Sequence, residues 1–230
     1  MVSDSENQIE MKEIKLDLVK LRQLPIKEQR HFVFILLMHR DLIFTMKLMD
    51  LVLKGQEAGE VHQAARASYT FFLLYLLIGK IIETKNFLKN ENLCQNHDDL
   101  PDIFKFIRDK LAFHYESKWN TPEVEDLVQN VLNDMKEFKI WASPQNYSNT
   151  IYQGMEETII KLILKKFGDK GTESFEELLK ETMKQAKVYE DKLSNLLDNF
   201  LENDIEIQEG VTVSINAPKL SKISIPLLIS

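Results

Sequence analysis

Hydrophobic positions along this 230-residue chain recur mostly with the spacing of helices. Two segments, 25–55 and 60–89, are apolar on almost every face, which is typical of central helices in a bundle. Pro25 stands where the first turn of a helix tolerates proline, and Gly55 follows the last periodic residues of the first segment. The pattern therefore predicts two long helices at the centre of the fold.

Other parts of the chain also show helical spacing or residues that begin helices. The additional ranges expected to be helical are 8–22, 101–114, 121–138, 149–167 and 172–203. The last of these combines an apolar stripe, from Phe175 to Phe200, with a face of acids and lysines that is typical of a solvated surface. The stretch "WASPQNYSN", residues 141–149, is expected to be a turn.

The C-terminal segment 205–230 alternates between apolar and polar residues, which predicts strands. Two short strands alone are marginal in water, so we expect this tail to lie on the helical body or to pair with a second copy. The expected organisation is one α-helical domain over 1–204 and an extended, β-like tail over 205–230.

Composition and charge narrow the class of protein. Hydrophobic residues make up 44% and charged residues 28%, which is ordinary for a globular protein, and 7 Gly with 6 Pro favour long helices. The net charge is −7, and between Glu173 and Glu209 there are 11 acids but only 4 lysines. The charge argues against a large basic surface that coats nucleic acid, whereas a local nucleic-acid site elsewhere stays open.

The sequence also indicates in which compartment of the cell the protein is expected. The longest uncharged apolar run, 67–79, is about 13 residues, short of the roughly 20 that span a bilayer. The chain begins "MVSDSENQIE", without a basic and apolar leader, and Cys94 is its only cysteine. We expect a soluble, cytoplasmic protein without a membrane partner.

The sequence gives only weak evidence for a metal site or a catalytic nucleophile. Glu28 and His31 have the Glu-x-x-His spacing of di-iron bundles, but no second such pair exists. His39 lies in a polar group that interrupts an apolar helix, for which a satisfied structural cluster is expected. There is no Gly-rich phosphate loop, no Gly-x-Ser-x-Gly and no paired Cys-x-x-Cys. We expect neither a metal nor a cofactor.

One short stretch, "IRDKLAFHYES" at residues 107–117, has a more specific pattern. Arg108 is followed by the polar Asp109 and, after a gap of five residues, by His114. This arrangement resembles the signature of the HEPN superfamily. The resemblance implies an all-α, HEPN-like helical bundle of about six to seven helices. It also implies a homodimeric, metal-independent endoribonuclease that acts on RNA, as in bacterial stress responses or phage defence.

The resemblance assigns roles to four residues. His114 would move protons, because an imidazole titrates near neutral pH. Arg108 would hold the phosphate with its forked, permanently charged guanidinium. Asp109 would orient one of the two, and Tyr115 would assist through hydrogen bonds. Together they would let the substrate's own 2′-hydroxyl attack the phosphorus without a metal.

In a regular α-helix, the side chains of Arg108 and His114 would not point toward each other. Six residues rotate about 600°, which leaves Arg108 and His114 roughly 120° and about 9 Å apart along the axis. The site therefore needs a helix that breaks near Phe113, an arginine that curls round, or a second chain. Otherwise the motif is structural, with Arg108 paired to an acid at 102, 109 or 116. The alternative function is then a non-catalytic, homodimeric interaction protein of the same fold, which binds through its acidic helix and tail.

Overall fold

A computed structural model describes most of the helical part of the chain. The described residues are 8–12, 18–55, 59–94, 99–112, 125–126, 129–130, 132–133, 135, 138–142, 150–167, 174–203 and 212–216. Contacts divide the chain into two compact units: residues 1–40 with 191–223, and residues 41–190 with 224–230. The expected division at residues 204 and 205 lies outside the described part and stays a prediction.

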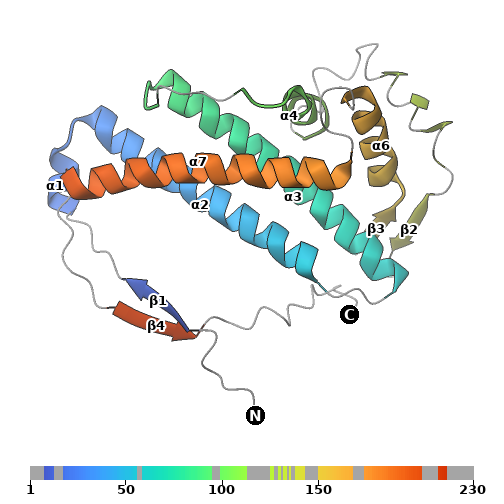
Figure 1. The fold of residues 1–230 in the computed structure, drawn as a ribbon, viewed down its shortest axis with the longest axis horizontal. Coiled ribbons are helices and arrows are strands. Elements are labelled where there is room, and N and C mark those ends of the chain that lie inside the picture. Colours follow the sequence, from blue (N-terminus) through green and yellow to red (C-terminus); the bar gives the residue numbers. More distant parts are fainter. Residues whose placement is uncertain are drawn as a thin grey trace. The chain divides into compact units, whose positions relative to one another are not determined.

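The expected all-α class is confirmed, because helices dominate the described residues (Figure 1). The described residues form six α-helices and one π-helix. The α-helices are α1 (Leu18–Gln23), α2 (Ile26–Lys54), α3 (Glu60–Asn90), α4 (Asp102–Phe106), α6 (Met155–Phe167) and α7 (Phe175–Asn203), and the π-helix is η2 (Ile107–Ala112). Both long central helices end within about two residues of the predicted bounds.

The first unit is built from α1 and residues 26–40 of α2, together with residues 191–203 of α7. Its apolar centre includes Phe32 and Ile35 of α2, which are 2% and 0% exposed, and Leu193 of α7, which is fully buried. The rings of Phe32 and Phe200 meet edge to face with centroids 5.7 Å apart. This is a favoured aromatic geometry, so α2 and α7 are joined here by specific packing.

The first unit also contains a strand pair that joins the two ends of the sequence. Strand β1 (Gln8–Lys12) pairs antiparallel with β4 (Thr212–Asn216), with Gln8 opposite Asn216. The expected helix over 8–22 is therefore wrong for residues 8–12, which form a strand, and α1 begins only at Leu18. The predicted strand character of the tail is confirmed for β4, which pairs with β1, while contact of the tail with the helical body or with a second copy stays a prediction.

The second unit is centred on α3. Its fully buried apolar side chains come from six helical elements: Leu42 and Met49 of α2, Leu74, Leu77, Ile78, Ile81 and Leu88 of α3, Phe104 of α4, Ile107 of η2, Ile163 of α6, and Leu178, Ala186 and Tyr189 of α7. Arg66 of α3 donates hydrogen bonds to the carbonyls of Val52 and Leu53 at 3.1 and 2.5 Å. The carbonyls at the end of α2 lack partners within the helix, so Arg66 satisfies them and fixes the corner between α2 and α3.

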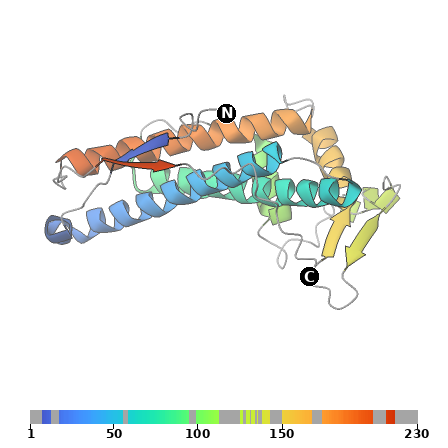
Figure 2. The ribbon, with the colours of Figure 1, turned by 90° about the horizontal axis from the view of Figure 1, so that it is seen from below.

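Strands β2 (Lys139–Ala142) and β3 (Thr150–Gln153) form an antiparallel pair beside the first turns of α3 (Figures 1 and 2). Two predictions fail here. Trp141 and Ala142, expected in a turn, belong to β2. The helix expected over 149–167 begins only at Met155, because residues 150–153 are a strand. Of the helix expected over 121–138, only 125–126, 129–130 and 132–133 are described as helical.

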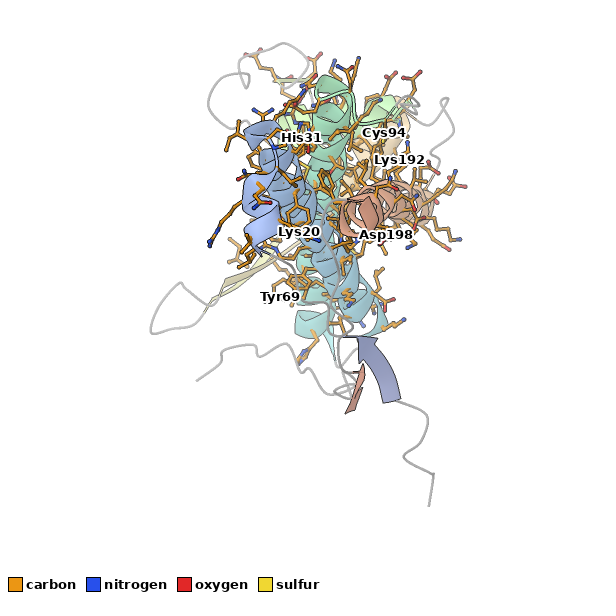
Figure 3. All side chains as sticks on the ribbon, turned by 90° about the vertical axis from the view of Figure 1, so that its left-hand side faces the viewer. Lys20, His31, Tyr69, Cys94, Lys192 and Asp198 are labelled. Carbon is orange, nitrogen blue, oxygen red and sulfur yellow. The ribbon has the colours of Figure 1, made fainter. Side chains whose placement is uncertain are left out.

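Helix α7 begins with a reciprocal capping interaction. The Ser174 Oγ accepts a hydrogen bond from the Glu177 backbone N–H at 3.2 Å, and the Glu177 carboxylate accepts one from the Ser174 N–H at 3.1 Å. This is a capping box, and it confirms the predicted helix start close to 172. Asp198 of α7 is exposed (Figure 3).

Candidate functional site

The segment that contains Arg108 is anchored by its apolar residues. Helix α4 follows Pro101, and its residues Ile103 and Phe104 are 2% and 0% exposed. Ile107, at the junction with η2, is also fully buried, and both α4 and η2 pack against α3. The backbone on the N-terminal side of Arg108 is therefore held firmly against the central helix.

The helix that carries the motif is not regular. An uninterrupted α-helix was expected over 101–114, but from Ile107 to Ala112 the chain is a π-helix. In a π-helix each N–H bonds to the carbonyl five residues back, so the turn is wider than in an α-helix. Such segments are rare and occur often at functional sites. The angle worked out for a regular helix therefore does not apply between residues 107 and 112.

The guanidinium of Arg108 lies between two carboxylates. Its Nη2 donates to Glu83 Oε1 at 2.8 Å, and its Nη1 donates to Asp109 Oδ1 at 3.0 Å. The side chain of Arg108 is 28% exposed, that of Asp109 is 19% exposed, and that of Glu83 is 57% exposed. Two negative charges thus surround one positive charge at the edge of α3 and η2.

The structure brings together two of the four predicted site residues. Arg108 and Asp109 are paired, as the structural alternative expected. His114 and Tyr115 lie outside the described residues, so the convergence of Arg108 and His114 stays a prediction. The described geometry thus covers the proposed phosphate clamp but not the proposed proton carrier.

Sequence reasoning missed Glu83, which lies 25 residues before Arg108 and in another helix. A signal was present, since Glu83 is the only acidic residue of α3 between Glu60 and Glu91. A single acid in a long central helix is a candidate partner for a cation on a neighbouring helix. Which cation would meet it could not be read from helical spacing.

Other polar groups of the described residues do not form a comparable site. His31 is 6% exposed, and the described residues contain no cluster of three or more His, Cys, Asp or Glu that could hold a metal ion. Asp41 forms an ion pair with Lys80 of α3 at 2.6 Å, which fits the polar cluster expected after His39. Cys94 is half-buried in the segment after α3 (Figure 3).

One stretch of the described residues, His62–Asn90 within α3, is long and apolar enough to cross a membrane. The same test is met by core helices of globular proteins, and 44% of the most apolar part of this stretch is buried inside the fold. The helix therefore gives only weak evidence of a membrane span.

Comparison of the chain with protein-family models, with curated proteins and with solved structures gave no match.

Proposed function

We propose that the chain is a HEPN-like endoribonuclease that cleaves RNA without a metal ion. The observation that supports the proposal is the state of Arg108. Its guanidinium is partly exposed, two carboxylates fix its orientation, and it lies in a π-helical segment. A forked cation held in place suits a phosphate whose negative charge grows during reaction.

In the proposed reaction, the 2′-hydroxyl of one nucleotide attacks the adjacent phosphorus. The bond from phosphorus to the 5′-oxygen of the next nucleotide breaks. His114 takes the proton of the 2′-hydroxyl and then gives it to the leaving 5′-oxygen, and Arg108 neutralises the charge on the phosphoryl oxygens. The products are a 2′,3′-cyclic phosphate and a free 5′-hydroxyl. Asp109 orients Arg108, to which it is hydrogen bonded at 3.0 Å.

The test is incubation of the purified protein with RNA in the presence and absence of EDTA. We expect cleavage with both, cyclic phosphate ends by mass spectrometry, and loss of cleavage in His114→Ala. His62→Ala is the matched control, because His62 is an exposed histidine of α3. Intact RNA with the wild-type protein at all concentrations would refute the proposal, as would equal activity of the two variants.

A second candidate function is that of a homodimeric interaction protein, and it is favoured by an exposed stripe on α2. Three large apolar side chains of the first unit recur at spacings of seven and four and are substantially exposed. They are Ile26 (81%), Val33 (48%) and Leu37 (39%). Residues at these spacings lie within roughly 60° of one another around a helix. This set is called the α2 stripe below.

The α2 stripe suits contact with a second copy of the chain. A two-fold interface brings the same patch of both copies together, so an exposed apolar stripe can pack against its own copy. A standard interface buries about 800 Å² on each partner, so the stripe would form the apolar centre of a larger contact.

The mass of the particle in solution tests this candidate. We expect a dimer by light scattering, and Leu37→Lys should convert it to a monomer because the lysine would be buried in the interface. Leu18→Lys is the control, since Leu18 is 53% exposed but lies on α1. A wild-type monomer at micromolar concentration, or a dimer that withstands Leu37→Lys, would argue against the stripe as the interface.

A further inference from the structure

The ion pair between Glu83 and Arg108 has a consequence for any anion that binds Arg108. A guanidinium binds phosphate best as a fork, with two N–H groups directed at two oxygens. Here the terminal nitrogens Nη1 and Nη2 already donate to Asp109 and Glu83. Each of these nitrogens carries a second N–H, but a phosphate that approaches through Nη2 must share that nitrogen with Glu83 and is repelled by its negative charge.

The two carboxylates differ in how easily they can leave. Asp109 is the next residue in the same helix, its side chain is only 19% exposed, and its position is tied to that of Arg108. Glu83 reaches Arg108 from another helix and is 57% exposed. An exposed ion pair is weak because water screens it, so Glu83 is the partner that an anion can replace.

The exchange requires no movement of the backbone. Ile107 precedes Arg108 and is fully buried, and Thr84 follows Glu83 and is 1% exposed. These neighbours fix the two backbones, while the Glu83 carboxylate lies at the surface. Rotation of one exposed side chain is therefore enough to open the Nη2 side of Arg108, and such rotations take nanoseconds or less.

We propose that Glu83 is a competing carboxylate, which occupies the phosphate-binding side of Arg108 until a phosphodiester displaces it. The inference rests on the proposed role of Arg108 as the phosphate clamp. Glu83 lowers the affinity of Arg108 for any anion, and a ligand must supply its own oxygens in the right geometry to take the place of the carboxylate. Asp109 stays bound to Nη1 and keeps the guanidinium oriented during the exchange.

The experiment measures binding without cleavage. The probe is a fluorescein-labelled, twelve-nucleotide single-stranded DNA, which lacks the 2′-hydroxyl that the proposed reaction needs, and its anisotropy is followed at low salt. Glu83→Gln removes the competing charge and keeps the size of the side chain. Because an exposed ion pair is worth little, we expect binding to tighten by between about 1.4-fold and fivefold.

Two further variants separate local competition from the general loss of one negative charge. Glu176→Gln removes a charge from another exposed ion pair, that with Lys180, and should leave affinity unchanged. Arg108→Gln should weaken binding. The double variant Glu83→Gln with Arg108→Gln should bind like Arg108→Gln alone, because Glu83 would have no clamp left to block.

The outcomes distinguish this inference from the proposed function. If Arg108→Gln weakens binding but Glu83→Gln binds no tighter than wild type, the competing role is overturned and the clamp stands. If none of the variants differs from wild type, Arg108 does not contact phosphate, and both ideas fall. If Glu83→Gln binds more tightly while the wild type leaves RNA intact, the inference stands and the endoribonuclease does not.

Discussion

Replacement of Phe32 by alanine tests the packing of the first unit. Phe32 is 2% exposed, and its ring meets that of Phe200 edge to face. Removing a buried phenylalanine ring costs about 3–5 kcal/mol, because apolar contacts are lost and a cavity is left. That is a large part of the roughly 5–15 kcal/mol that stabilises a typical domain. We expect Phe32→Ala to lower the midpoint of urea unfolding, followed by circular dichroism, by a corresponding amount.

The same substitution at an exposed position is the control. Phe72 is 64% exposed, so Phe72→Ala should change the free energy of unfolding by about 0.5 kcal/mol or less. If Phe32→Ala does not fold, Phe32→Leu, expected to cost about 1.5 kcal/mol or less, keeps the comparison measurable. Equal effects of Phe32→Ala and Phe72→Ala would refute the assignment of Phe32 to the core. A double-mutant cycle with Phe200→Ala should give a coupling of about 0.5–1.5 kcal/mol for the ring pair.

Two predictions concern α7. Ser174→Ala removes the cap of the helix and should lower the free energy of urea unfolding by about 1 kcal/mol. Ser174→Asp can accept the same hydrogen bond from the Glu177 N–H and should lower it little. Equal losses of stability in both variants would contradict the capping role of Ser174. The hydrogen bond and charge of Lys180 lower the pKa of Glu176 from 4.5, and Glu176 likewise raises the pKa of Lys180 from 10.5. The contribution of the Glu176 carboxylate to the stability of the fold is therefore present above its unfolded pKa and is lost as the pH falls through its folded pKa. The contribution of the Lys180 ammonium is lost as the pH rises through its raised pKa. In a carboxyl NMR titration, Lys180→Gln should return the pKa of Glu176 toward 4.5, and an unchanged value would contradict the pairing.

The long helices could be predicted from the sequence because their signals are local. Helix α2 lies between Pro25 and Gly55, and α7 starts at a capping box. Strands β1, β2 and β3 were missed for a different reason. Strand β1 alternates apolar and polar residues, but its partner β4 lies about 200 residues away, and a strand without a known partner is hard to tell from a frayed helix. Residues 150–153 were assigned to α6 because Ile151 also fits the apolar spacing of that helix.

In the candidate site, too, contacts between residues adjacent in sequence could be predicted, and contacts between distant residues could not. The pairing of Arg108 with Asp109 was within reach, because the two residues are adjacent in sequence. The pairing with Glu83 depends on how η2 packs against α3, and the π-helix depends on the hydrogen bonds of the folded chain. Neither follows from a motif of ten residues. The motif could therefore suggest which chemistry to look for, but not the electrostatic state of its arginine.

That electrostatic state bears on how an acidic chain could act on RNA. The segment 173–209, with 11 acids and 4 lysines, carries a charge of −7, which equals the net charge of the whole chain. The rest of the chain is therefore close to neutral and supplies no broad positive field. Recognition of a phosphate would then depend on short-range contacts, and at Arg108 these contacts are contested by Glu83. An arginine with this competitor would bind poorly to a phosphate that approaches with arbitrary geometry. It would favour one that is presented so that two oxygens meet the guanidinium fork. Low bulk affinity combined with a demanding local geometry would suit the proposed endoribonuclease, because such an enzyme would leave most RNA uncut.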